Sequence, residues 1–203
     1  MNFADSSKPL EQPKLLIVEG KDEVNFFDAI KNHIGKTDLE IRHFGGVNNL
    51  RGYLEVLKGI EGFERVVSLG VIRDAEEDAA AAFKSVRDGL RSAGFPLPTL
   101  PLQVAVGIPQ VVVLINPHGK NSGSLEDICL QAVSGSPFLN CVDLYVECLR
   151  KLGPPARESK TRVHAFIAGR DRPEVSLGVA AKQGYFPLNH AAFGPTRQLL
   201  TML

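Results

Sequence analysis

The sequence predicts an α/β fold, a mainly parallel sheet flanked by helices, followed by a helical C-terminal portion. In the first half of the 203 residues, short apolar runs alternate with longer stretches whose apolar residues lie three or four apart. This alternation is typical of parallel βαβ units. From residue 124 onward the apolar spacing is mostly helical.

Three pairs of a strand and a helix make up the predicted core. Residues 15–18, "LLIV", have the length and composition of a buried strand, and residues 22–34 carry one apolar stripe of a helix. The chain then continues with a strand at 39–44, a Gly-Gly turn, a helix through Leu50, Leu54 and Leu57, a strand at 65–74, and an alanine-rich helix that ends at Gly94.

The stretch after the third helix breaks this pattern. The proline-rich "FPLPTLP" is followed by "LQVAVGI" and "QVVVLINP", which we predict to pair as a β-hairpin. Helical segments follow from Ser124 to the C-terminus. We therefore expect a disordered leader at residues 1–13 and a single domain at 14–203, with its core at about 14–116 and its helical part at about 124–203.

Composition excludes few functions. Lys plus Arg and Asp plus Glu number 23 each, so net charge neither indicates a nucleic-acid partner nor argues against a local basic groove. No apolar run reaches the roughly 18 residues that span a bilayer, and the polar N-terminal stretch lacks the apolar core of a signal peptide. Cys129, Cys141 and Cys148 have no disulfide or zinc-site spacing, and we expect them to be buried. These features favour a cytoplasmic protein without a membrane partner.

Carboxylates follow two of the predicted strands at the point where each strand ends. Glu19 closes the first strand and Asp74 the third, with Glu76 and Asp78 just behind. Ligands of parallel α/β sheets bind beyond the carboxyl ends of the strands. Carboxylates gathered there repel one another unless a cation lies among them. Oxygen ligands suit Mg²⁺ or Mn²⁺, either of which can polarise a phosphodiester and activate water.

Each of these acids also has a structural explanation. Asp74 and Glu77 fit a capping box, with Asp74 as the N-cap of the third helix. Asp22 could cap the first helix in the same way, and the stretch from Ser124 to Asp127 resembles another cap. Acids in a first helical turn also interact favourably with the helix dipole.

"LLIVEGKDE" followed by "LGVIRDAEED" resembles the pattern of the Toprim domain, in which one strand ends in Glu-Gly and a later strand in Asp-x-Asp. The turn "FGGVNNL" lies where Toprim proteins have their second strand and turn. The later segments resemble a family of small stand-alone Toprim-related proteins known as a domain of unknown function. This resemblance covers nearly the whole chain and implies a Toprim-like, Rossmann-like fold.

The resemblance also implies roles for the strand-end acids. Glu19 corresponds to the Toprim glutamate, a general acid/base or metal ligand, and Asp74 to the first acid of Asp-x-Asp. The second acid is Glu76 here, a departure that lengthens the side chain, and Asp78 could substitute for it.

The resemblance to OLD-type nucleases implies roles for three further residues. Asp22 lies where those nucleases carry an additional acid. By the same analogy Glu126 could serve a second metal ion, and Lys160 could neutralise charge on a phosphate.

The function that this pattern favours is Mg²⁺- or Mn²⁺-dependent phosphodiester chemistry on nucleic acid, DNA or RNA, as in a nuclease. The alternative is a non-catalytic binding or regulatory module that keeps the fold around a degenerate metal site. The chain has no Walker motif, so an ATP-driven activity would need a partner ATPase.

Overall fold

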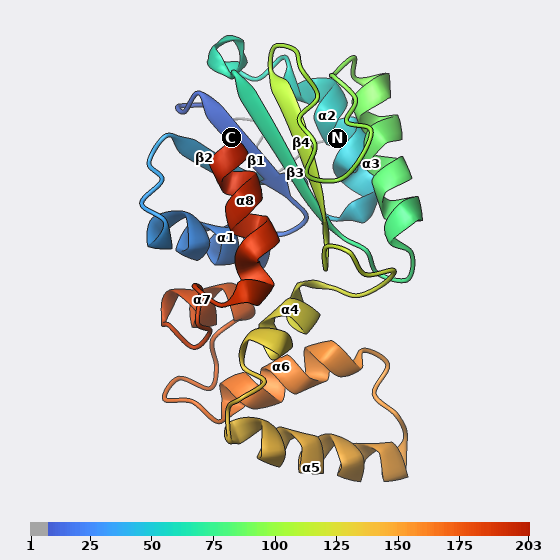
Figure 1. The fold of residues 1–203 in the computed structure, drawn as a ribbon, viewed down its shortest axis with the longest axis vertical. Helices are drawn as coiled ribbons and strands as arrows, with labels where there is room; N and C mark the ends of the chain where they lie inside the picture. The colour runs from blue at the N-terminus through green and yellow to red at the C-terminus, as the bar shows by residue number, and fades with distance from the viewer. Residues whose placement is uncertain (1–7) are drawn as a thin grey trace.

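The computed structural model describes residues 8–203 and contains one four-stranded sheet in that range (Figure 1). The spatial order of the strands is β2-β1-β3-β4, and every neighbouring pair is parallel. The strands are β1 (Lys14–Val18), β2 (Leu39–His43), β3 (Ser68–Asp74) and β4 (Gln110–Asn116). The predicted parallel α/β sheet is confirmed.

Helices cover both faces of this sheet. On one face α1 (Lys21–His33) and α8 (Gly194–Met202) pack over Leu16 and Val18 of β1. On the other face α2 (Leu50–Leu57) and α3 (Ala79–Ser92) pack over Leu15 and Ile17. Because successive residues of a strand face opposite sides, a strand covered on both sides must be apolar throughout. This accounts for the uninterrupted run "LLIV".

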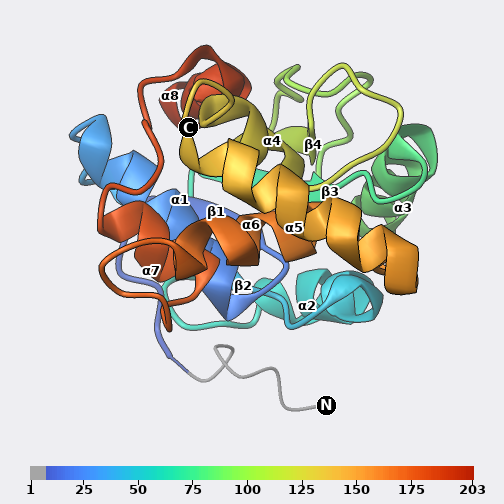
Figure 2. The ribbon, with the colours of Figure 1, turned by 90° about the horizontal axis from the view of Figure 1, so that it is seen from below.

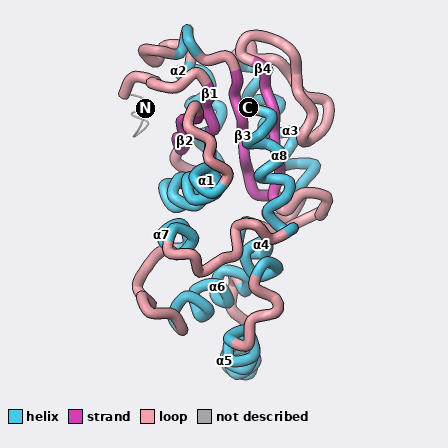
Figure 3. The backbone as a smooth tube through the Cα atoms, turned by 60° about the vertical axis from the view of Figure 1, so that its left-hand side comes forward, coloured by secondary structure: helices cyan, strands magenta, loops and turns pink. Residues whose placement is uncertain are grey.

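The C-terminal portion is helical, as predicted. Its helices are α4 (Leu125–Ala132), α5 (Phe138–Leu152), α6 (Glu158–Ala168), α7 (Leu177–Lys182) and α8. Figures 1 and 3 show α4, α5 and α6 beyond the carboxyl ends of the strands, while α8 returns along the sheet. Figure 2 looks onto α5 and α6 from below. α6 packs on α4, α5 and α7, and α7 packs on α1. These contacts place the start of α6 opposite the strand ends.

The predicted hairpin forms only in part. The second segment is β4, but the first makes one antiparallel bridge, Ala105 with Val111, in place of a strand. The side chains of Val106 and Ile108 are 92% and 91% exposed, so the chain leaves the sheet directly after Ala105. The prediction of a β-hairpin was therefore wrong for its first strand.

Part of the predicted leader is packed. Leu10 is fully buried, and its N–H donates to the Glu61 carbonyl over 2.7 Å. Arg42 donates to the Lys8 and Pro9 carbonyls at 2.8 and 2.6 Å. Residues 1–7 of the leader lie outside the described residues.

Burial of the cysteines is confirmed for Cys129 and wrong for the other two. Cys141 and Cys148 are exposed because α5 buries a single stripe formed by Leu139, Val142 and Val146. Within residues 8–203, no helix is long and apolar enough to cross a membrane.

Candidate functional site

A cleft of about 340 Å³ lies at the carboxyl ends of β1 and β3. Charged side chains from four segments of the chain line it: Glu19, Asp22, Glu23, Asp74, Glu76, Glu126, Asp127, Arg157, Glu158 and Lys160. We refer to the carboxylates of Glu19, Asp22, Glu23, Asp74, Glu76 and Glu126 as the acidic wall, and to Arg157 and Lys160 as the basic wall. All of the predicted site residues except Asp78 line the cleft.

Glu19 and Asp74 meet because their strands are neighbours. β1 pairs with β3 in parallel, with Ile17 opposite Val71, so both strands end at the same edge of the sheet. The Glu19 carbonyl accepts hydrogen bonds from Gly45 and Gly46, both at 3.0 Å. The Gly-Gly turn after β2 thus fixes the backbone at the end of β1.

Backbone hydrogen bonds fix the position of Glu76. It forms an antiparallel bridge with Gly123, with N–H to carbonyl distances of 2.9 and 2.8 Å in the two directions. Its φ of 51° lies in the left-handed region, which is uncommon for a residue other than glycine and costs free energy. The bridge joins the end of β3 to the loop that leads into α4.

Asp78 has a structural role away from the cleft. Its carboxylate accepts hydrogen bonds from the Ala80 and Ala81 N–H groups at 2.8 and 3.0 Å, which makes it the N-cap of α3. The capping-box interpretation therefore placed the start of this helix at the wrong acid. Because Asp78 serves as the cap, Asp74 remains in the cleft.

The first turn of α1 uses its acids differently from the prediction. Asp22 does not cap α1. Its carboxylate accepts hydrogen bonds from the Ser176 hydroxyl and from the Gly178 N–H, the latter at 2.8 Å. Glu23 closes the turn instead, since it accepts from the N–H groups of Glu19 and Gly20 at 2.6 and 3.3 Å. Sequence reasoning missed Glu23, although its place three residues after Gly20 is a capping-box signal.

The cap-like start at Ser124 is confirmed. Asp127 accepts hydrogen bonds from the Ser124 N–H and hydroxyl at 2.8 and 3.2 Å, and from the Ser159 hydroxyl of α6. Asp127 thus ties α4 to α6. The side chain of the neighbouring Glu126 makes no hydrogen bond or ion pair within the described residues, and it lines the cleft.

The acidic wall carries carboxyl groups that resist ionisation. Burial raises the pKa of Glu23 to about 8. Burial also raises the pKa of Glu19 and lifts that of Asp74 well above its ordinary value. The second cause is mutual repulsion, from the charge of Glu76 at Glu19 and from that of Glu23 at Asp74. Burial and mutual repulsion therefore both disfavour full ionisation of the wall.

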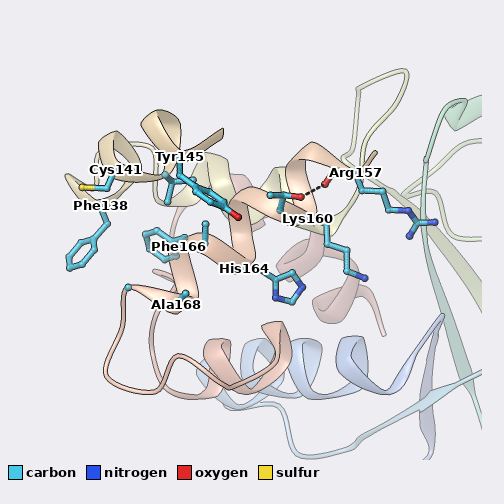
Figure 4. A pocket seen from close by; sticks show the side chains of 12 residues that line it. Phe138, Cys141, Tyr145, Arg157, Lys160, His164, Phe166 and Ala168 are labelled. Atoms are coloured by element: carbon cyan, nitrogen blue, oxygen red, sulfur yellow. Dashed lines mark hydrogen bonds between the residues drawn. The ribbon is translucent and has the colours of Figure 1, made fainter. Parts of the chain in front are cut away.

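The basic wall stands at the start of α6. Within residues 8–203, the side chains of Arg157 and Lys160 make no hydrogen bond or ion pair, and both are exposed. Figure 4 shows them leaving the first turn of the helix, with Arg157 nearest the strands. The charge of Arg157 lowers the pKa of Glu19 and so opposes part of the upward shift. Arg157 had no sequence signal, because "GPPARES" indicates only a loop.

The donor atoms of the acidic wall suit a hard divalent cation, because all are carboxylate oxygens. Asp22 and Glu23 already accept hydrogen bonds. Backbone hydrogen bonds from Val47 and Leu125 also lower the pKa of Glu19 and of Asp74, respectively. The side chains of Glu76 and Glu126 accept no hydrogen bond within residues 8–203. Across residues 8–203, no three Asp, Glu, His or Cys side chains converge closely enough to hold a metal ion. The chemistry of the wall fits a metal site, and its side chains are not gathered into a coordination shell.

A family model described as a protein of unknown function (DUF3226) matches residues 13–203. The chain belongs to this family. The match covers nearly the whole chain, as the sequence predicted. No curated protein matches the DUF3226 chain.

Two solved structures are similar to the DUF3226 chain. The C-terminal region of the Xanthomonas campestris pv. campestris OLD protein is 12% identical with a TM-score of 0.43, covering 95% of this chain and 86% of that one. The C-terminal region of the Burkholderia pseudomallei OLD protein is 15% identical with a TM-score of 0.42, covering 95% and 98%. With TM-scores this low, the similarity carries no argument about function.

Proposed function

We propose that this DUF3226 protein has a Toprim-like metal site and cleaves phosphodiester bonds of nucleic acid with Mg²⁺ or Mn²⁺. One observation carries the proposal. Carboxylates from two adjacent strand ends and from α4 face two cations without partners, Arg157 and Lys160, across a single cleft. A phosphate together with a divalent cation would complement both walls.

Asp74 and Glu76 would hold the metal ion together with Glu19, while Glu126 and Asp22 would serve a second ion. When bound, the ion would polarise the phosphodiester and lower the pKa of an attacking water. Asp22 is the weakest of these ligands, because its carboxylate already accepts hydrogen bonds from Ser176 and Gly178.

The chain's own groups supply the remaining chemistry. The raised pKa of Glu19 brings its proton exchange closer to neutral pH, which suits a general acid or base. Lys160 and Arg157 are placed to offset negative charge on a phosphate in the cleft.

A second candidate is a non-catalytic module that binds nucleic acid or regulates a partner. It is favoured by the absence of a converging carboxylate triad among residues 8–203, and by Glu76 standing where the Toprim pattern has an aspartate. Such a module would bind its ligand without turnover.

One experiment distinguishes the two candidates. In it, the protein is incubated with labelled single- and double-stranded DNA and RNA in Mn²⁺, Mg²⁺ or EDTA. For a nuclease, we expect metal-dependent cleavage that Asp74→Ala lowers at least about 100-fold, because mutating a residue that only supports a metal ligand already lowers activity by up to that factor.

Asp171→Ala is the matched control, since Asp171 is an exposed acid outside the cleft. Equal cleavage by wild type and Asp74→Ala would contradict the enzyme. Binding without cleavage, together with a metal-induced rise in Tm, would favour the module.

A further inference from the structure

A second hollow adjoins the cleft. It is a groove of about 730 Å³ between α5 and α6, lined mainly by apolar atoms. Arg157 and Lys160 line both the groove and the cleft, so the two spaces share a wall. Figure 4 shows the groove side chains in order along the helices, with Phe138 at one end and Arg157 at the other. We refer to it as the α5–α6 groove.

Aromatic rings line the groove away from the cleft. Tyr145 is 50% exposed, and Phe138 is 42% exposed. The Arg170 guanidinium lies 4.1 Å from the ring centroids of both Phe138 and Phe166, which fixes these two rings around one cation. No such contact holds the ring of Tyr145 among residues 8–203, so its face is available for stacking.

Two cations line the groove toward the cleft, Arg157 directly before α6 and Lys160 in its first turn. His164 follows Lys160 by four residues, on the same face of α6. None of their side chains makes a hydrogen bond or ion pair within the described residues. The surface therefore runs from carboxylates through unpaired cations to aromatic rings.

We infer that the α5–α6 groove binds a base of a single-stranded nucleic acid next to the phosphate held in the cleft. The backbone phosphate beside that base would lie at Lys160 and Arg157. Stacking on aromatic rings above a basic track is the general way in which proteins hold unpaired strands. A duplex keeps its bases stacked inside the helix, so its bases do not reach such a groove.

This inference deepens the proposed function, because it names single strands as the substrate class. It also has a readout that does not depend on cleavage. The probe is a single-stranded DNA dodecamer that carries one 4-thiothymidine, or its RNA counterpart with 4-thiouridine. Each is bound to the protein in a buffer that contains Ca²⁺. Irradiation crosslinks the thio-base to whatever it touches, and mass spectrometry maps the peptide.

We expect crosslinks in the α5–α6 segment, residues 138–169. We also expect Tyr145→Ala to weaken binding of the dodecamer about tenfold, as loss of one stacking partner does. Tyr145→Phe keeps the ring and should bind like wild type. Leu144→Ala is the matched control, because Leu144 is 68% exposed on α5 and lies outside the groove. A blunt duplex should bind equally to wild type and Tyr145→Ala.

Crosslinks confined to other peptides, or equal dodecamer binding by wild type and Tyr145→Ala, would overturn the inference even if the protein cleaves nucleic acid. So would a dimer in sedimentation that Tyr145→Ala dissociates, because the groove would then be covered by a second copy. Crosslinks in the groove without any cleavage would uphold the binding site and count against the proposed nuclease.

Discussion

The acidic and basic walls of the cleft hold their charges in different ways. The acids of the sheet edge stand on paired strands and a capped helix, and burial with mutual repulsion raises the pKa of Glu19, Glu23 and Asp74. Arg157 and Lys160 stand on an exposed helix start and have no partners within residues 8–203. A cation bound at the acidic wall would relieve the repulsion among its carboxylates. The unpaired cations of the basic wall could bind an anion. A metal ion and a phosphate together would satisfy both.

The largest expected effect comes from the packing behind the acidic wall. Gly178 of α7 lies so close to α1 that a Cβ would be 2.1 Å from the Asp22 carbonyl oxygen and 2.7 Å from the Asn25 Cβ. Because a backbone oxygen cannot move aside, we expect Gly178→Ala to lower the free energy of unfolding by at least about 2 kcal/mol. Urea unfolding would measure this.

Gly194→Ala is the control for this substitution. Gly194 starts α8, and a Cβ there would meet no atom within 4 Å. It should leave stability unchanged or raise it slightly. Equal unfolding midpoints for the two variants would contradict the expected clash between α7 and α1.

The next largest effect is expected from a substitution in the basic wall. We expect Lys160→Ala to lower the cleavage rate about 10- to 100-fold, because it removes a cation that offsets charge on the phosphate. Metal binding should persist, since every proposed ligand remains. Rates and the metal-induced rise in Tm, both measured on the same samples, would separate the two walls.

Lys151→Ala serves as the matched control, because Lys151 is an exposed lysine on α5 outside the cleft. If Lys160→Ala abolished the metal-induced rise in Tm, the two walls would not act separately. If it left cleavage at the wild-type rate, the basic wall would have no part in turnover.

The smallest effect, at most about 1.4 kcal/mol per pH unit, comes from the buried Glu23 carboxyl of the acidic wall. The pKa of Glu23 is about 8 in the fold against an ordinary value of 4.5, so between these values the folded state binds more protons than the unfolded state. The free energy of unfolding should therefore fall as pH rises through this window without metal. Glu23→Gln removes the charge and should make the fall shallower, with the gain in Tm greatest near pH 8.

Melting curves in EDTA at several pH values between about 5 and 8 would measure this slope. Glu77→Gln is the control, since Glu77 is exposed and does not line the cleft. Added Mg²⁺ should flatten the wild-type slope. Identical slopes for wild type and Glu23→Gln would mean that burial does not raise the pKa of this carboxyl group.

Local patterns predicted the fold well because they are set by burial. "LLIV" had to be a doubly covered strand, and a parallel order followed from the helices between strands. The same patterns failed at "LQVAVGI", where β-like composition does not decide whether the chain stays in the sheet. They also failed for Cys141 and Cys148, whose positions on α5 depend on which stripe faces the core.

The sequence by itself determined that Glu19 and Asp74 end parallel strands at one edge of the sheet, and the structure made those two strands neighbours. Only the tertiary structure decided which acids remain free. Asp78 and Glu23 are taken by helix starts and Asp22 by α7, while Glu126 stays uncommitted. It alone brought Arg157 and Lys160 opposite the acids, because α6 is placed by its packing on α4, α5 and α7. Hydrogen bonds within one turn leave a signal in the sequence, whereas contacts between distant helices depend on the packing of the whole chain.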